Sequence, residues 1–270
     1  MSNGAERAFE TVIFEKRGAI AWVTLNRPEK FNAYNMAMRD DLFAVLSAIH
    51  DDAEIRAMVL AGAGPAFSTG GDLAEFGMAP SPIVARWVRF RRDVWGRLNA
   101  LPVPTIAAVH GFTVGGGLEM AMLCDIAIAA DDTRMCLPET GAAMIPGVAG
   151  TQTASRRMGL GRALDMCITG RWIDAREALL VGLVAEVVPL AQLSRRAEAL
   201  GREFARVPRE LSALVKLAVR GGLDLALGDG LALERRLAMR HSVVRGTARG
   251  KRARRAAGGR REGSRRKVGQ

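Results

Sequence analysis

Cysteine is scarce in this sequence and never occurs in a paired motif. The 270 residues contain three cysteines, Cys124, Cys136 and Cys167, and no CxxC pair. This odd, widely spaced set favours buried thiols in a reducing compartment over a disulfide framework or a metal site. The three histidines are equally dispersed and lack the spacing of metal ligands.

Long apolar stretches are also missing. No run of eighteen apolar residues occurs, and the N-terminal sequence MSNGAERAFETVIFEKRG lacks the basic-then-apolar order of a secretory signal. We therefore expect a cytoplasmic protein with no membrane partner. With 49% hydrophobic residues, the chain can bury the core of one large domain, or of one domain with a helical appendage.

Positive charge is concentrated at one end of the chain. The formal net charge is +11, but residues 245–270 hold eleven of the Lys and Arg residues against one acid, so the rest is nearly neutral. A basic tail is typical of nucleic-acid or anionic-membrane binding, yet this one has no aromatic residue for base stacking. A solvated, disordered tail is the favoured interpretation, and nucleic-acid binding is the alternative.

Strand and helix patterns alternate along most of the chain. Runs rich in β-forming residues occur at 12–16, 19–25, 57–64, 104–111, 125–130 and 183–189. The first two runs predict a hairpin. Helices are predicted at 36–50, 116–123, 151–159 and 174–181. This alternation predicts an α/β fold with parallel strands, followed from residue 190 to about 244 by helices with a break at Pro208.

A glycine-rich stretch, GPAFSTGGDLAEF, covers residues 64–76 and follows a predicted strand. Because Gly71 has no side chain, its backbone N–H can approach a ligand closely. An ordinary glycine-rich turn would explain the same residues, so this stretch alone does not distinguish binding from structure.

A second glycine-rich stretch, HGFTVGGGLEMAMLCD at 110–125, lies between a predicted strand and a predicted helix. The first amides of a helix have no internal partner, so Gly116 offers an N–H with the helix dipole behind it. Nucleotide-binding patterns do not fit, because no lysine follows the glycine triplet and Met120 occupies the last position of a GxGxxG alignment. A GxSxG serine elbow is absent as well.

Two such amides directed at one oxygen would form an oxyanion hole, which stabilises a carbonyl oxygen as it becomes enolate-like. Glu119 lies three residues after Gly116, and therefore on the same face of the predicted helix. Glu139 follows Pro138 in an irregular segment. Taken singly, Glu119 is equally explained as a carboxylate favoured at a helix start, and Glu139 as a surface acid.

Five stretches, in order along the chain, resemble the enoyl-CoA hydratase/isomerase (crotonase) superfamily. They are NRPEKFNAYN at 26–35, FSTGGDL at 67–73, HGFTVGGGLEMAMLCD at 110–125, PETGAAMIPGVAGTQTASRRMG at 138–159 and DAREALLVGLVAEVVP at 174–189. Each pattern is weak alone, but five in register are specific. The resemblance covers roughly residues 10–240.

The resemblance implies a particular organisation of the chain. Residues 1–190 would form a crotonase-like spiral of ββα repeats that holds the active site, and residues 191–245 a helical region that packs trimers, often paired into hexamers. Residues 246–270 depart from the family, whose members usually end in a motif like AFxEKRxPxF that closes the acyl pocket. We interpret this last segment as an atypical, disordered Arg/Gly-rich tail.

The resemblance also implies the residues of the site. The family's oxyanion amides correspond to Gly71 and Gly116, and the two glutamates of its hydratases correspond to Glu119 and Glu139. Further contacts with a bound acyl-CoA are expected at Ala33, Ala66, Ser68, Thr69, Gly70, Asp72, Leu73 and Gly115.

Neighbouring charged and aromatic residues have two possible roles each. Arg27 and Lys30 lie where the family meets the CoA phosphates, although solvated charges would look the same. The stretch SPIVARWVRFRRDVWGRL occupies the region that lines the family's acyl tunnel. Its aromatic residues Trp87, Phe90 and Trp95 either limit the acyl-chain length or, as we expect for most of them, pack into the core from an amphipathic helix.

The activity implied is hydration of a 2-enoyl-CoA, with Glu119 as the chief base on water and Glu139 as the proton donor to Cα. Retention of both glutamates favours a hydratase over an isomerase or a carnitinyl-CoA-like dehydratase. A weakly catalytic acyl-CoA- or RNA-binding protein is the alternative from a different class. No metal or redox cofactor is expected, because the chemistry is acid–base and coenzyme A is part of the substrate.

Overall fold

The computed structural model describes residues 9–240, and the chain divides into two compact units after Arg209. The first unit holds two β-sheets and the helices that cover them, and the described part of the second is helical. Within residues 9–240, no helix is both long enough and apolar enough to cross a membrane. All three cysteines are buried, and none of them forms a disulfide bond.

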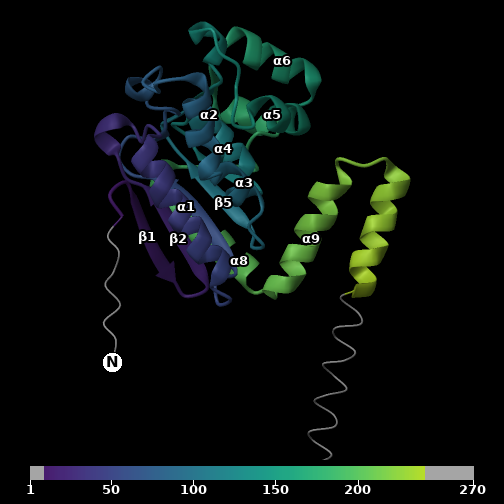
Figure 1. Cartoon of the computed structure of the whole chain (residues 1–270). Helices are drawn as coiled ribbons and strands as arrows, with labels where there is room; N and C mark the ends of the chain where they lie inside the picture. Colours follow the sequence, from purple (N-terminus) through teal and green to yellow (C-terminus); the bar gives the residue numbers. More distant parts are fainter. Residues whose placement is uncertain (1–8, 241–270) are drawn as a thin grey trace, which may run out of the picture. The chain divides into compact units, whose positions relative to one another are not determined.

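Six strands form the larger sheet. They are β1 (Val12–Arg17), β2 (Ile20–Leu25), β3 (Ala57–Gly62), β5 (Thr105–Val109), β7 (Ile126–Ala130) and β10 (Glu186–Val188), in the order β1-β2-β3-β5-β7-β10. The β1–β2 pair is an antiparallel hairpin, and every other pair is parallel. Gly18 in the hairpin turn has a φ of 63°, which glycine adopts without strain. The predicted hairpin and parallel sheet are confirmed (Figure 1).

Four short strands form a second sheet in the order β4-β6-β8-β9. They are β4 (Ala66–Ser68), β6 (Phe112–Val114), β8 (Arg134–Cys136) and β9 (Ile173–Asp174). None of them was predicted, because a run of two or three residues is too short to show the alternation that identifies a strand. They form because each lies beside a partner strand, not because of a strong local pattern.

The chain passes three times from the large sheet to the small sheet and then into helical structure. The helical segments that follow β4, β6 and β8 are η2 (Leu73–Glu75), α2 (Pro82–Arg91), α3 (Val94–Asn99), α4 (Gly116–Leu123), η3 (Glu139–Ala142), α5 (Gly150–Met158) and α6 (Leu160–Thr169). This repetition is the expected ββα spiral. Helix α6 was not predicted, because the expected helix ends at residue 159, and Gly159 at a φ of 81° separates α5 from α6.

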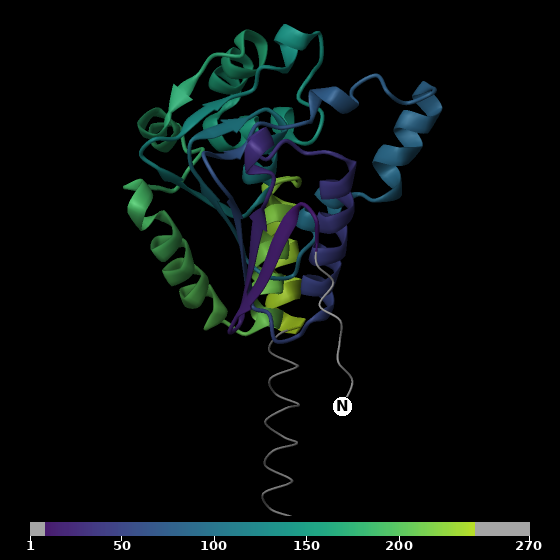
Figure 2. The same ribbon diagram turned by 90° about the vertical axis from the view of Figure 1, so that its left-hand side faces the viewer.

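Helices cover both faces of the larger sheet (Figure 2). Helix α1 (Met36–Asp51) lies on one face, and α8 (Leu190–Ala205) lies across the other. The apolar side chains between α8 and the sheet form one core cluster, and those on the side of α1, α3 and α4 form a larger one. The remaining elements of this unit are η1 (Pro28–Lys30) and α7 (Ala175–Leu180).

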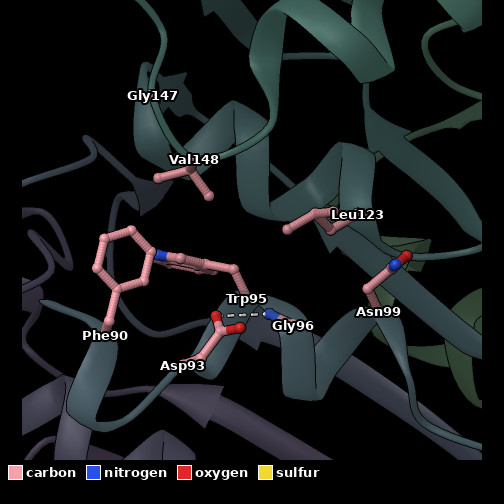
Figure 3. Close-up of a pocket in the computed structure, with 8 residues that line it drawn as sticks. All are labelled: Phe90, Asp93, Trp95, Gly96, Asn99, Leu123, Gly147 and Val148. Atoms are coloured by element: carbon pink, nitrogen blue, oxygen red, sulfur yellow. Dashed lines mark hydrogen bonds between the residues drawn. The ribbon is translucent and has the colours of Figure 1, made fainter.

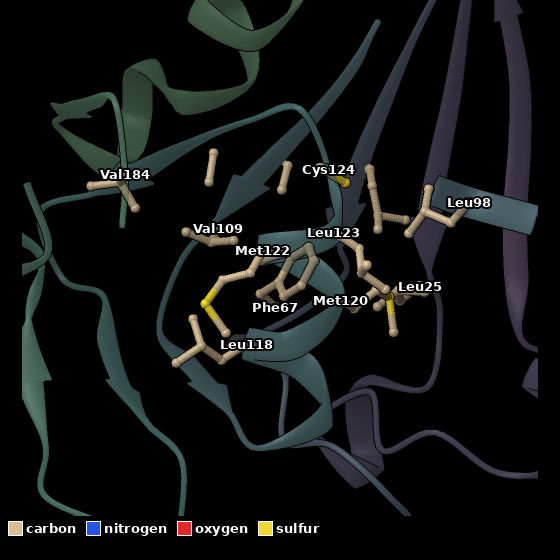
Figure 4. Close-up of a cluster of buried hydrophobic side chains, with 14 of the residues drawn as sticks. Leu25, Phe67, Leu98, Val109, Leu118, Met120, Met122, Leu123, Cys124 and Val184 are labelled. Atoms are coloured by element: carbon tan, nitrogen blue, oxygen red, sulfur yellow. The ribbon is translucent and has the colours of Figure 1, made fainter. Parts of the chain in front are cut away.

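Helix α4 runs through the middle of the larger core cluster. Every residue from Gly117 to Leu123 is buried, as expected for a helix that is apolar on all sides. Figure 4 shows Leu118, Met120, Met122 and Leu123 projecting from this helix among side chains of several strands, including the fully buried Phe67 of β4. Buried contacts on every side hold α4 rigidly, so groups carried by α4 have fixed positions.

The second unit contains α9 (Arg209–Gly222) and a further helix at 227–240. The predicted helical pattern after Pro208 is confirmed, but the break at 223–226 was not foreseen. The predicted tail at 246–270 lies outside the described residues.

Candidate active site

Gly115 turns the chain from strand β6 into helix α4. Its φ of 51° and ψ of −125° suit glycine alone, and its N–H donates to the carbonyl of Cys136. A Cβ at this position would lie 2.9 Å from Oε1 of Glu139. Gly116 is then the first residue of α4, so its N–H has no partner within the helix.

The FSTGGDL segment lies directly against the start of α4. Tyr34 pairs with this segment, because its N–H donates to the carbonyl of Gly70 and its carbonyl accepts from the N–H of Asp72. A Cβ at Gly70 would lie 2.8 Å from the nitrogen of Gly116, and a Cβ at Gly116 would lie 3.6 Å from the nitrogen of Gly71. The Gly71 and Gly116 amides are therefore neighbours, and within residues 9–240 neither N–H donates a backbone hydrogen bond.

Asn32 holds the loop beneath this amide pair. It is fully buried at a φ of 55°, and its side-chain NH2 donates to the carbonyls of Ala63 and Ala66, both at 2.8 Å. Its side-chain oxygen accepts from the N–H of Arg27, and its own carbonyl accepts from the hydroxyl of Ser68. Four residues, one before β3 and three after it, are thus joined by one asparagine.

The residues that were expected to contact acyl-CoA differ in how far they are exposed to solvent. Ala66 and Ser68 are completely buried, backbone included, so neither residue is exposed to a ligand in this structure. Ala33 is also buried, Thr69 is half-buried, and Leu73 is largely exposed.

Arg27 does not stand free to meet a phosphate. Its guanidinium donates to the carbonyl of Ala33 at 2.6 Å and pairs with Asp72 at 3.0 Å, with both side chains mostly buried. The N–H of Ala74 and the Arg27 guanidinium together hold the pKa of Asp72 below its usual value. Arg27 and Asp72 therefore connect the two loops that carry the site, whereas Lys30 is exposed.

Glu119 is held by the start of another helix. Its residue is only 2% exposed, and Oε1 accepts hydrogen bonds from the N–H groups of Val148, Ala149 and Gly150 at 2.9, 2.9 and 2.6 Å. These amides lie at the N-terminus of α5, where unpaired N–H groups and the helix dipole favour a negative charge. A Cβ at Gly150 would lie 2.9 Å from Oε1, so a side chain there would displace the carboxylate.

Glu139 has a contrasting environment. It is the first residue of η3, and its Oε2 is buried without a hydrogen-bond partner among the described residues. Burial raises the pKa of Glu139, and the charge of Glu119 raises it further. One carboxylate is thus surrounded by donors and the other is set up to hold a proton.

Phe76 is a site residue that the sequence did not indicate. A Cβ at Gly71 would lie 2.8 Å from its ring, so the ring covers the Gly71 backbone. Phe76 follows η2 and is half-exposed. A ring in this position shields the amide pair from water on one side.

A cavity of about 300 Å³ lies next to Val148, whose N–H donates to Glu119 (Figure 3). It is lined by Phe90, Asp93, Trp95, Gly96, Asn99, Leu123, Gly147 and Val148. The expectation that most aromatic residues of this region pack into the core was wrong for Trp87 and Phe90, which are 57% and 61% exposed. Trp95 is half-buried, and its ring centroid lies 4.8 Å from that of Tyr34.

The site thus combines two neighbouring amides that donate no backbone hydrogen bond within residues 9–240, a carboxylate held by three donors, and a carboxylate whose Oε2 is buried without a partner among the same residues. A model of the family described as enoyl-CoA hydratase/isomerase matches residues 15–250 of the sequence. The chain belongs to this family. A probable enoyl-CoA hydratase of Mycobacterium tuberculosis is 36% identical over 229 residues, which cover 85% of this chain and 88% of that relative.

Solved structures of the enoyl-CoA hydratase/isomerase family have the same fold. An enoyl-CoA hydratase from Bacillus anthracis superimposes with a TM-score of 0.81 at 33% identity, over 85% of this chain and 90% of that one. A putative enoyl-CoA hydratase from Thermobifida fusca, solved in complex with CoA, gives a TM-score of 0.81 at 28% identity, over 88% and 95% of the two chains. The chain is therefore of the enoyl-CoA hydratase type over nearly all of its described length.

Proposed function

We propose that this enoyl-CoA hydratase adds water across the 2,3 double bond of a 2-enoyl-CoA thioester and forms the 3-hydroxyacyl-CoA. The observation that carries the mechanism is the contrast between the two carboxylates. Glu119 accepts three N–H groups at one oxygen, while the Oε2 of Glu139 is buried with no hydrogen-bond partner among residues 9–240. Addition of water needs one carboxylate as base and one carboxylic acid as proton donor.

The thioester carbonyl would bind between the N–H groups of Gly71 and Gly116. As water attacks, negative charge moves onto this oxygen, and two preorganised donors stabilise it without having to reorient. The dipole of α4 adds to the effect, since Gly116 is at its positive end. Polarisation of the carbonyl makes the β-carbon electrophilic.

Glu119 would then take a proton from water as the water oxygen bonds to the β-carbon. Glu139 would give its proton to the α-carbon, so that one hydroxyl and one hydrogen are added in all. Glu119 is left protonated and Glu139 ionised, and transfer of one proton between them, directly or through solvent, restores the starting state. The two groups therefore act as a pair.

The reaction so described uses no metal ion or redox cofactor, because every step is a proton transfer or an addition, and coenzyme A arrives with the substrate.

We also propose a cytoplasmic enzyme of fatty-acid β-oxidation that assembles as a trimer or as a hexamer of two trimers. Apolar side chains left exposed on the helices of the second unit, among them Val215, Val219 and Leu227, support self-association. A light-scattering mass equal to one chain would contradict it.

The activity is tested by the loss of absorbance of the conjugated 2-enoyl thioester, with the 3-hydroxyacyl-CoA identified as product. An isomerase would move the double bond without adding oxygen, so the mass of the product separates the two activities. No product of either kind would count against the proposed function.

Glu139→Gln is expected to lower kcat by about 100-fold, because the amide cannot donate a proton to the α-carbon. Binding of a saturated acyl-CoA should change little, since glutamine has the same shape. Steady-state kinetics and calorimetry measure the two effects. The matched control is Glu54→Gln at an exposed glutamate, and a Glu139→Gln enzyme as fast as this control would refute the assigned role.

The pH dependence of kcat/KM should be bell-shaped, with a basic limb set by Glu139. Its pKa is raised, so the proton needed at the α-carbon is retained to a higher pH than in an ordinary carboxyl group and is lost as pH rises further. The charge of Glu119 contributes to this shift. In Glu119→Gln, the infrared C=O band of protonated Glu139 should therefore disappear at a lower pH than in the wild type. An unchanged midpoint would show that the two carboxyl groups do not interact.

A further inference from the structure

The strands that lead to the two proposed oxyanion amides run side by side. β4 and β6 are parallel neighbours in the small sheet, and their last pair is Ser68 opposite Thr113. Gly71 follows Ser68 by three residues, and Gly116 follows Thr113 by three. The register of β4 against β6 therefore sets how the two amides lie relative to each other.

A single residue, His110, joins the two segments just before these strands begin. Its imidazole Nε2 lies 2.9 Å from the carbonyl oxygen of Gly64, which precedes β4. A carbonyl oxygen only accepts hydrogen bonds, so Nε2 carries the hydrogen and donates it. The carbonyl of His110 in turn accepts the N–H of Phe67 at 2.9 Å. His110 thus binds the β4 segment at two points.

The two backbones are in close contact at the same place. Gly111 has a φ of 51° and forms an isolated β-bridge with Ala66. A Cβ on Gly111 would lie 2.1 Å from the carbonyl oxygen of Pro65, so the position requires glycine. This contact prevents the segments from moving closer together, and the hydrogen bonds of His110 oppose their separation.

Two side chains hold the carbonyls of the turn that leads into β4. His110 donates to Gly64, and Asn32 donates to residues on either side of it, Ala63 and Ala66. Asn32 belongs to the loop before α1, whereas the chain continues from His110 through β6 into α4. Of these two donors, His110 is therefore the one that joins the turn to the helix carrying the second amide.

His110 lies on the side of the large sheet that faces away from α4. A cavity of about 240 Å³ lies beside it, lined by Leu190 and Leu193 of α8 and by Ala61 and Ala108 near the sheet. Helix α8 covers the face of this sheet opposite to α1 and α4. His110 can therefore act on the two amides through the strands, without touching the substrate.

We infer that His110 is a positioning residue for the oxyanion hole: its hydrogen bond to Gly64 holds β4 in register with β6 and keeps the Gly71 and Gly116 amides directed at the same oxygen. The inference rests on the proposed function, because it takes the role of the two amides from that mechanism. Two donors act on one oxygen only while their separation is fixed, and a displacement of about 1 Å can cost about 100-fold in rate.

The test compares His110→Gln with His110→Met. The Nε2 of glutamine is as many bonds from Cα as the imidazole Nε2, so it can still donate to the Gly64 carbonyl. Methionine has a similar length and no donor. We expect His110→Met to lower kcat about 10- to 100-fold, and to change the Kd of a saturated acyl-CoA less than about threefold. His110→Gln should restore most of the lost kcat.

The infrared C=O band of a bound saturated acyl-CoA, labelled with carbon-13 at the thioester carbon, is the second readout. Hydrogen bonds to a carbonyl oxygen weaken the C=O bond and lower its stretching frequency. In His110→Met the band should move back towards its position in free acyl-CoA, and in His110→Gln it should stay where it is in the wild type. A general loss of stability would not move this band.

A double-mutant cycle with Gly116→Pro tests the route of the effect. In the Gly116→Pro enzyme one of the two donors is already absent, so their relative position matters less, and His110→Met should lower kcat by less than about threefold there. An equal loss in both backgrounds, or a His110→Gln enzyme as slow as His110→Met, would overturn the inference. His110→Asn, whose amide ends one bond short of Nε2, takes the place of His110→Met if the methionine variant does not fold.

His50→Met is the matched control, because His50 is an exposed histidine in the last turn of α1. Its kcat and its C=O band should equal those of the wild type. If no 2-enoyl-CoA is hydrated but the band of the bound thioester is shifted and depends on His110, the positioning role stands and the proposed reaction fails. If hydration occurs and His110→Met changes neither kcat nor the band, the reaction stands and the positioning role fails.

Discussion

Glu119→Gln is expected to lower kcat by about 1,000-fold, the largest loss from a single side chain in this protein. The amide oxygen of glutamine can still accept the three N–H groups at the start of α5, so the side chain should keep its position. It cannot accept a proton from water, and loss of a positioned base costs about 10²–10⁴ in rate. The measurement is steady-state hydration of the best 2-enoyl-CoA. A kcat within tenfold of the wild type would rule out Glu119 as the base.

Glu119→Ala provides the contrast that separates chemistry from structure. Alanine leaves the N–H groups of Val148, Ala149 and Gly150 without their acceptor in a buried place, which costs about 1–3 kcal/mol for each unsatisfied group. The alanine variant should therefore lose thermal stability together with activity. The glutamine variant should keep a melting temperature close to that of the wild type, which shows that its defect is chemical.

Gly116→Pro is expected to lower kcat by about 100- to 1,000-fold. Proline has no N–H, so one of the two proposed oxyanion donors is removed, and donors of this kind contribute about that factor in other enzymes. The first position of a helix is where proline is best tolerated, so α4 should still form. Kinetics with the same substrate measure the loss.

Gly116→Ala is the control for this change. Its Cβ would make only ordinary contacts, at 3.5 Å from Gly70 Cα, 3.6 Å from Gly71 N and 3.9 Å from Glu119 Oε2, and its N–H is retained. Alanine should therefore be much more active than proline at this position. Equal losses in the two variants would mean that space near Gly116, and not its N–H, is what catalysis requires.

The sequence predicted the structure best where a short stretch of residues determines the local conformation. The bounds of α4 were predicted as they stand, because a strand, three glycines and an apolar helix follow one another in a single stretch. The prediction that the Gly71 and Gly116 amides lie together came from the family resemblance, since the two residues are far apart in the chain and only folding brings them together.

Other parts of the site left no local signal. The donors to Glu119 are backbone groups about thirty residues away, and backbone groups have no residue type to recognise. The position of the Phe76 ring against Gly71 could not be predicted from the sequence either. Trp87 and Phe90 were expected in the core because α2 is amphipathic, but both rings are exposed, and a contact that does hold this helix is polar, the bond from Arg39 to the carbonyl of Val88.

The buried cysteines have a consequence for the enzyme's tolerance of its own substrate. An alkene conjugated to a thioester adds a thiolate far more readily than it adds water without a catalyst, and only the thiolate form of a cysteine is strongly nucleophilic. Burial and the charge of Glu139 raise the pKa of Cys136 to about 12, and burial together with both glutamate charges raises the pKa of Cys167. Burial, the larger cause at both positions, thus keeps the two sulfur atoms protonated, so self-alkylation by the substrate is suppressed.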